Sequence, residues 1–237
     1  MQDVTVGRAL PAVQKGRTAL HLAASNGQYE IVSYICVVPG INVNVHDQFG
    51  FTPLHLTAHS PNHDDQRACV IKEVLNVKNI NPNSVMDGKF HDAADFQGSR
   101  ITVLHLAVRG KFKDAVDLLL AWRPKQGDET IIDVGLRWPW GFTPLHLAIR
   151  GMNVPIIEAL IRFIDTNWPE AINLTDCKHR TPLHIAVMDS NRTALQIFLR
   201  QKVPIKADEK DIDGNRPFSI AKEKRDYVMV VLLESYF

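Results

Sequence analysis

The chain has 237 residues, of which 45% are hydrophobic and 22% charged, and its formal net charge is +1. This composition is typical of a folded protein with a buried core and excludes a disordered chain. The balanced charge gives no bulk attraction for nucleic acid or for an anionic membrane surface, and no apolar run approaches the roughly twenty residues that cross a bilayer. We therefore expect neither nucleic acid nor a membrane as partner.

The three cysteines, Cys36, Cys69 and Cys177, lie far apart and form no C-x-x-C pair. This spacing favours free thiols in a reducing compartment over a disulfide framework. The first residues also lack the basic-then-apolar pattern of a secretory signal. We expect a cytoplasmic protein.

Residues 1–15 carry no recognisable motif and are expected to be a lead-in or a partial repeat. From residue 16 onward a short motif recurs, with histidines 34, 50, 41 and 38 residues apart and Ser219 in the histidine position a further 35 residues on. A recurrence near 33 residues is typical of a helical solenoid. The copies are GRTALHLAA at 16, GFTPLHLTA at 50, SRITVLHLAV at 99, GFTPLHLAI at 141, HRTPLHIAV at 179 and a degraded GNRPFSIAK at 214.

Each motif predicts a short inner helix, and a second helical segment follows it. The threonine can cap the first turn, and a proline one place later has the backbone angle that a helix start tolerates. Apolar residues at i, i+3, i+4 and i+7 predict the second helices. These outer segments are 29–38, 69–77, 112–122, 154–164 and 192–201.

The recurring T-[AP]-L-H-[LI]-A motif resembles the ankyrin repeat family over residues 16–237. The resemblance implies an all-α solenoid of about six stacked helix-turn-helix repeats with β-hairpin-like fingers, forming a single domain. A single repeat cannot bury its own apolar face, so neighbours must stack and the terminal copies become caps. The expected repeats are 16–49, 50–97, 98–140, 141–178 and 179–213, with a capping repeat at 214–237.

Three connections are longer than the period requires, namely 79–97, 123–140 and 165–176. Insertions in repeat proteins fall on loops at one face, which is often the binding face. We expect lengthened loops in repeats two to four, and they could either extend that face or fold back over it.

The resemblance implies that the motif histidines are structural, with ring nitrogens directed to the threonine hydroxyl and to backbone groups of the neighbouring repeat. These residues are His21, His55, His105, His146 and His184.

The alternative is a metal-binding protein or an enzyme with a site around His59 and His63, which Asp64 and Asp65 follow. Pro61 spoils the i, i+4 geometry that a helical metal pair needs. Signatures of hydrolases, phosphate loops and dinucleotide sites are missing from the sequence, so we expect no catalytic residue, no metal and no cofactor.

The resemblance places partner recognition on the finger tips and on the exposed side of the inner helices. It implies a monomer that binds another protein, through an acidic or apolar segment of that protein. We expect the apolar members of this set to be exposed between basic neighbours. The predicted partner-binding residues are Phe49, Phe51, Ile101, Trp138, Trp140, Phe142, Lys178 and Arg180.

Several positions and roles stay open at this stage. Arg109 and Arg150 follow equivalent motifs and could serve the scaffold or a basic binding face. Asn44 resembles the finger asparagine that an oxygen-dependent hydroxylase modifies in this family. The chain could be a host-directed bacterial effector, acting in the host cell cytoplasm, or the targeting part of a longer protein.

Overall fold

The computed structural model describes residues 16–60, 64–87, 100–124, 131–201 and 204–235. Within these ranges the chain forms six consecutive helix pairs, each with an inner helix from the motif and an outer helix after it. The pairs are α1 (Ala19–Ser25) with α2 (Tyr29–Cys36), α3 (Pro53–His59) with α4 (Asp64–Leu75), α5 (Val103–Arg109) with α6 (Lys113–Ala121), α7 (Pro144–Arg150) with α8 (Val154–Asn167), α9 (Pro182–Met188) with α10 (Arg192–Leu199), and α11 (Pro217–Glu223) with α12 (Tyr227–Glu234).

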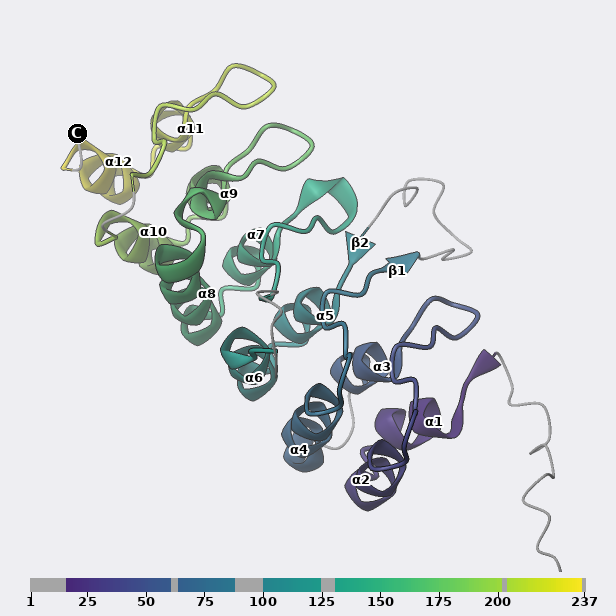
Figure 1. Cartoon of the computed structure of the whole chain (residues 1–237). Coiled ribbons are helices and arrows are strands. Elements are labelled where there is room, and N and C mark those ends of the chain that lie inside the picture. Colours follow the sequence, from purple (N-terminus) through teal and green to yellow (C-terminus); the bar gives the residue numbers. More distant parts are fainter. Residues whose placement is uncertain (1–15, 61–63, 88–99, 125–130, 202–203, 236–237) are drawn as a thin grey trace, which may run out of the picture.

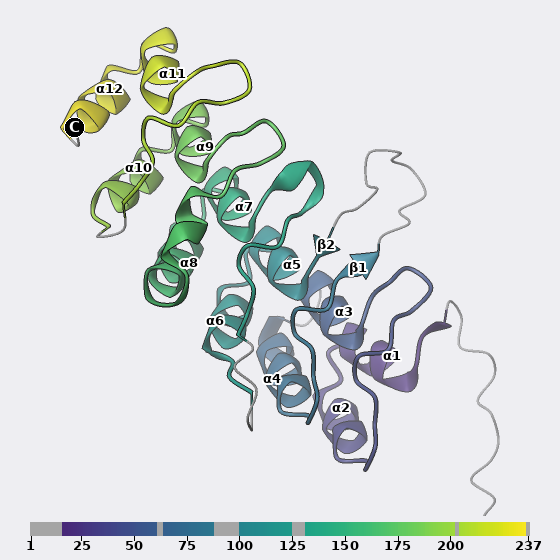
Figure 2. The same cartoon turned by 45° about the horizontal axis from the view of Figure 1, so that its top comes forward.

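The pairs stack in chain order into an elongated solenoid with two rows of helices (Figure 1). The odd-numbered inner helices form one row and the even-numbered outer helices form the other, and each helix packs against its counterpart in the next repeat. Finger loops project beside the inner row, as both views show (Figures 1 and 2). The predicted all-α solenoid of about six repeats is confirmed. No helix in the described ranges is both long and apolar enough to cross a bilayer.

Threonine and histidine together cap each complete inner helix. In α7 the Thr143 hydroxyl accepts the backbone N–H of His146, while His146 Nδ1 accepts the backbone N–H of Thr143 at 3.2 Å. Each residue thereby satisfies a donor that a helix start leaves unpaired. The same reciprocal pair occurs at Thr18–His21, Thr52–His55, Thr102–His105 and Thr181–His184.

The other nitrogen of the imidazole ties one repeat to the next. Because Nδ1 accepts a hydrogen bond from the threonine, Nε2 carries the ring hydrogen. The Nε2–H group donates a hydrogen bond to a backbone carbonyl of the following repeat. The predicted structural role is confirmed for these four histidines. The bonds run from His21 to Phe51 at 3.0 Å, from His55 to Ile101 at 3.2 Å, from His146 to Arg180 at 3.0 Å and from His184 to Asn215 at 3.2 Å.

A second set of inter-repeat bonds runs along the connections that follow the outer helices. Each asparagine amide donates to a carbonyl of the next connection and accepts an N–H two residues further on. This ladder satisfies backbone groups that loops would otherwise leave unpaired. Its members are Asn44 with Asn79 and Asn81, Asn83 with Ile131 and Asp133, and Asn173 with Pro204 and Lys206.

Buried or partly buried aspartates shape three of the fingers. Asp47 accepts the backbone N–H groups of Phe49 and Phe51, and Asp176 and Asp211 make the same pair of bonds in their own fingers. In the finger between α6 and α7, Trp138 occupies the aspartate position. Two consecutive residues of that finger, Trp140 and Gly141, have positive φ angles of 62° and 78°, and the Gly141 N–H donates to the Trp138 carbonyl at 2.9 Å. Trp140 is therefore the third residue of a four-residue turn, a place where a positive φ favours glycine.

The three lengthened connections take different forms. In the first connection, β1 (Met86–Asp87) pairs antiparallel with β2 (Arg100–Ile101), and residues 88–99 between them lie outside the described ranges. In the second connection, residues 125–130 lie outside the described ranges. The third was expected to be a loop, which is wrong. Helix α8 continues to Asn167 and the 3₁₀ helix η4 (Pro169–Asn173) follows it, because Ala171 and Ile172 of the connection are buried and join the core.

The junction between the third and fourth repeats departs from this pattern. His105 Nε2 is buried and makes no hydrogen bond of ordinary geometry, although the nearby backbone of Leu136 and Phe142 raises its pKa against the larger effect of burial. Gly135 stands in the asparagine position, and a Cβ there would lie 2.4 Å from the Trp168 ring, so the tryptophan occupies the space of the missing amide. The Trp138 ring packs against His105 with their centroids 5.8 Å apart. Aromatic packing replaces hydrogen bonds at this junction.

Removal of the two matched histidines should therefore have unequal effects on stability. Both rings are fully buried, but His146 bonds both its own repeat and the next, whereas His105 bonds only its own. We expect His146→Ala to lower the free energy of unfolding by about 1 kcal/mol more than His105→Ala. Urea denaturation of the two variants measures the difference, and equal losses would contradict the bridging role of Nε2.

Stability should also fall as the pH is lowered. Burial lowers the pKa of His55, His105 and His146 from 6.5 to about 4. Between these values the unfolded chain binds more protons than the folded chain, so acid favours unfolding by about 1.4 kcal/mol per pH unit for each such histidine. Urea midpoints between pH 6.5 and pH 5 test this, before most carboxylates titrate. The variant His146→Gln should show a shallower slope, and a flat wild-type profile would refute the neutral state of the rings.

Candidate protein-interaction surface

The exposed side of the inner helices, together with the finger tips, forms the surface that we call the inner face. Its inner-helix positions are the seventh residues after the motif threonine, in the last turn of each helix. In repeats two to five these residues are exposed, and each lies beside the aromatic or basic residues at the base of the fingers. They are His59, Arg109, Arg150 and Met188.

These last-turn residues cover the residue that precedes the motif threonine in the same repeat. The His59 ring lies 5.5 Å from the Phe51 ring, and the Arg150 guanidinium lies 5.2 Å from the Phe142 ring. In the fifth repeat an Arg180 nitrogen lies 3.9 Å from the Met188 sulfur. The inner face therefore has two layers, a base of finger residues and a cover of helix residues.

The predicted exposure of the apolar finger residues is wrong for Phe51, Ile101 and Phe142, and the predicted partner-binding residue Trp138 is buried as well. Phe51, Ile101, Phe142 and Trp138 are only 6%, 2%, 3% and 9% exposed. Their side chains turn under the inner helices and join the core, because the last-turn residues or the preceding helix cover them. Phe49 is half-buried and packs against the same core.

Trp140 and Lys178 are the two predicted residues that the structure leaves exposed. Trp140 is 53% exposed at the tip of its finger, and Lys178 is exposed at the tip of the next finger. The two fingers are joined by a backbone bond of 2.9 Å from Cys177 to Trp140. These two side chains therefore lie on adjacent, connected tips.

Arg180 is half-buried and carries a structural bond. Its guanidinium lies 2.6 Å from the buried carboxylate of Asp176 and 5.9 Å from the centre of the Phe142 ring. One edge of this guanidinium is thus occupied by the ion pair with Asp176 of the same finger. Arg180 therefore connects the finger of residues 176–180, the fifth, to the Phe142 ring at the base of the finger between α6 and α7, the fourth.

Arg109 and Arg150 continue the basic row toward the N-terminal repeats. The Arg109 guanidinium lies 5.4 Å from the Trp138 ring, and within the described ranges neither arginine forms an ion pair. Burial and the charge of Arg109 lower the pKa of His59. The sequence left these two arginines between a scaffold and a binding role, and their shared place within LHLAVRG and LHLAIRG was the signal that pointed to one surface.

The alternative metal site is only partly within the described structure. His59 packs on Phe51 and faces the positive charge of Arg109, which disfavours a cation there. His63 and the side chains of Asp64 and Asp65 lie outside the described residues. Among the residues that the structure does describe, no three His, Cys, Asp or Glu side chains gather into a metal-binding group.

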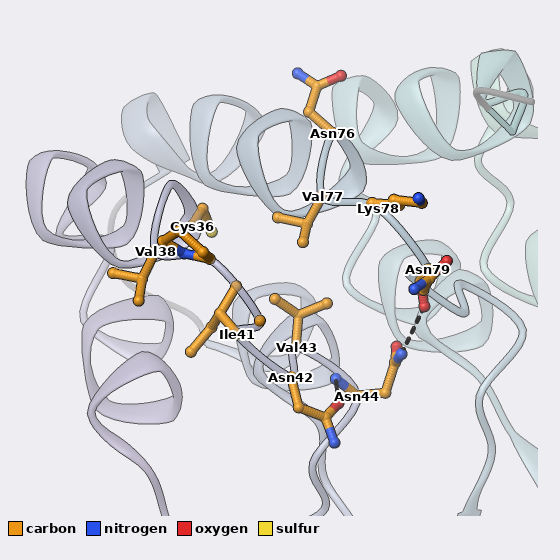
Figure 3. A pocket seen from close by; sticks show the side chains of 12 residues that line it. Cys36, Val38, Ile41, Asn42, Val43, Asn44, Asn76, Val77, Lys78 and Asn79 are labelled. Carbon is orange, nitrogen blue, oxygen red and sulfur yellow. Dashed lines mark hydrogen bonds between the residues drawn. The ribbon is translucent and has the colours of Figure 1, made fainter.

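A groove of about 580 Å³ lies away from the inner face, between the ends of α2 and α4 and the connections that follow them (Figure 3). Its titratable side chains are Cys36 and Lys78, and burial raises the pKa of the Cys36 thiol to about 11. The thiol therefore stays protonated and unreactive at neutral pH. Asn44, the predicted hydroxylation site, lines this groove with its amide bonded to Asn79 and Asn81, and its modification stays a prediction.

The fold and the inter-repeat bonds define a stack of helix-turn-helix repeats, and comparison with known proteins identifies its class. A family model described as ankyrin repeats in three copies matches residues 4–85 and 104–213. The chain belongs to the ankyrin repeat family. Repeats of this family generally bind other proteins and do not catalyse reactions.

Similar proteins show the same repeats in varied settings. Alpha-latrotoxin-Lh1a of Latrodectus hasselti is 30% identical over 64% of this chain and 10% of its own length, and human inversin is 30% identical over 77% and 15%. A chain of the solved complex between the predatory endopeptidase Bd0816 of Bdellovibrio bacteriovorus and immunity protein Bd3460 aligns with a TM-score of 0.67. That alignment covers 93% of this chain and 99% of the other at 21% identity, and it shows the fold alone. This chain spans only a small part of the curated relatives.

Alanine substitutions of two aromatic residues of one finger should lower the free energy of unfolding by unequal amounts. Phe142→Ala removes a buried ring and should lower the free energy of unfolding by about 3 to 5 kcal/mol. Trp140→Ala removes a half-exposed ring and should cost less than about 1 kcal/mol. Chemical denaturation of both variants checks this, and a small loss for Phe142→Ala would restore the expectation that its ring is solvent-facing.

Proposed function

We propose that this chain is a non-enzymatic interaction module that binds a partner protein on the inner face and finger tips of repeats three to five. The partner contacts are Trp140, Lys178 and the exposed edges of Arg109, Arg150 and Arg180. Phe49, Phe51, Ile101, Trp138 and Phe142 support this surface from below. The module acts as a monomer in the cytoplasm.

The observation that carries the proposal is the conformation of Trp140. A tryptophan with φ of 62° costs about 1 to 2 kcal/mol relative to ordinary backbone, and more than half of its side chain is nevertheless exposed. Glycine would occupy this turn without strain. Strained, exposed residues of this kind cluster at functional sites.

The composition of the surrounding surface supports the same conclusion. Binding hot spots favour tryptophan and arginine within a polar rim, and here Trp140 stands beside Lys178 and the arginine row. The basic side chains form one short row, which is less than the broad stripe that nucleic acid requires. A protein segment is therefore the partner that this surface suits.

The setting of the module is proposed on family habit alone. A host-directed bacterial effector and the targeting part of a longer protein are both consistent with an irregular ankyrin stack. Under the first hypothesis the module acts in the host cell cytoplasm.

The test is the variant Trp140→Gly, which removes the ring and relieves the left-handed backbone. We expect an unchanged or slightly higher melting temperature, together with at least about a tenfold loss of partner capture, equivalent to 1.4 kcal/mol. Capture from lysate of the source cells, quantified by mass spectrometry, measures the loss.

Tyr34→Ala is the matched control, since Tyr34 is an aromatic residue that is 81% exposed on outer helix α2. It should leave capture unchanged. If capture fell with Tyr34→Ala and not with Trp140→Gly, the interface would lie on the outer helices and the proposal would be wrong.

A further inference from the structure

We propose that the inner face of repeats three to five recognises an acidic, proline-containing segment of its partner, with a carboxylate at every third residue of an extended chain. The inference rests on the proposed function and names the partner's chemistry. Two guanidinium groups in equivalent positions, those of Arg109 and Arg150, carry the recognition, and Arg180 adds the remaining edge of a guanidinium that is paired with Asp176.

These guanidinium groups are held in place before any partner arrives. Arg109 lies over Trp138 at 5.4 Å, while Arg150 and Arg180 lie over Phe142 at 5.2 Å and 5.9 Å. Contact with a ring face restricts a side chain that would otherwise sample many rotamers, so binding loses less entropy. The planar forks of Arg109 and Arg150 can then donate to a carboxylate, whereas the fork of Arg180 already donates to Asp176.

The charge of the surroundings favours an acidic ligand. Arg109 and Arg150 are exposed and form no ion pair within the described ranges, and Lys178 adds an exposed ammonium on the fifth finger. The neighbouring carboxylate, Asp176, is buried and accepts bonds from the backbone and side chain of Arg180. Arg109, Arg150 and Lys178 therefore present positive charge to solvent without an ion pair in the described ranges, whereas the charge of Arg180 is paired with Asp176.

The spacing of the repeats selects the conformation of the ligand. Stacked helices lie about 8 to 10 Å apart, so Arg109 and Arg150, which occupy equivalent positions of successive repeats, have about that separation. A polyproline-type chain has three residues per turn and rises 3.1 Å per residue, which places every third side chain on one side at about 9.3 Å. A β-strand places same-side residues at about 6.6 Å or 13 Å and fits less well.

The exposed ring of Trp140 favours proline at the intervening positions. Proline-rich segments dock on exposed aromatic side chains and have little conformational freedom to lose. Trp140 belongs to the finger between α6 and α7. The base of the same finger carries Trp138 and Phe142, the rings under Arg109 and Arg150. A Glu-Pro-Pro repeat thus presents both kinds of group that the inner face can bind.

The experiment titrates the protein into fluorescein-labelled synthetic peptides and follows fluorescence anisotropy. The probe is a peptide with three Glu-Pro-Pro units, and its isomer has the three glutamates adjacent and the prolines grouped. We expect the probe to bind at least about tenfold more tightly than the isomer, which is 1.4 kcal/mol, and more tightly than a version with glutamine in place of glutamate. Equal binding of probe and isomer would reduce the effect to bulk charge and overturn the inference.

Two further peptides separate other ligands from the proposed one. One carries phosphoserine in place of glutamate, and the other is a helical peptide with glutamate at every seventh residue, which spaces carboxylates by about 10.5 Å along one helix face. Tighter binding of either peptide than of the probe overturns the inference.

Substitutions in the protein locate the binding site. Arg109→Gln and Arg150→Gln should each weaken probe binding about tenfold, because each removes a charge-assisted contact. Arg150→Lys keeps the charge but loses the planar fork and should also weaken binding. The matched control Arg162→Gln removes an exposed arginine of outer helix α8 and should have no effect. Unchanged binding by Arg109→Gln and Arg150→Gln, with melting temperatures preserved, would refute the site.

Partner capture distinguishes this inference from the function on which it depends. If Trp140→Gly abolishes capture and the two arginine variants do not reduce it, the interaction module stands and the acidic segment is wrong. If none of these variants affects capture, the inner face is not the interface and both proposals fail.

Discussion

The structure depends on one polar contact, the neutral imidazole that joins two repeats. His146 Nδ1 accepts a hydrogen bond from its own helix start and Nε2–H donates one to the next repeat, and protonation of Nδ1 would remove the acceptor. Burial keeps the ring neutral by lowering its pKa to about 4. The carbonyl that receives the bond belongs to Arg180, the residue just before the next motif threonine. The bond therefore fixes the base of that finger against the preceding repeat, and the same bond acts at three other junctions.

The third and fourth repeats show what happens when that contact is missing. His105 lacks its second bond, Gly135 replaces the ladder asparagine and Trp138 replaces the finger aspartate. Tryptophan rings fill the space that the polar groups leave, and non-directional packing takes over from directed bonds. This exchange also creates the aromatic layer beneath the arginines. The local departure from the repeat pattern and the candidate binding surface are thus the same feature.

The sequence predicted the parts of this protein that repeat, and it failed where neighbours decide the outcome. Five threonine–histidine pairs and the helical periodicity predicted the inner and outer helices and the role of four histidines. The burial of Phe51 and Phe142 could not be predicted, because it depends on whether the last-turn residue of the inner helix turns over them. The sequence showed that the connection at 165–176 is longer than the repeat requires. It could not show that this length folds into the end of α8 and into η4, because that depends on packing against neighbouring helices.

Charge is distributed unevenly along the inner face, and this gives the surface a direction. The arginine row ends at the fifth finger, and the sixth finger carries Asp208, Asp211 and Asp213. Asp211 is occupied by two backbone N–H groups of its own turn, and Asp213 is exposed at the tip. An acidic segment on the arginines would be repelled there, since like charges held in place oppose close approach. The last repeat would then both cap the stack and limit how far a negatively charged ligand extends toward it.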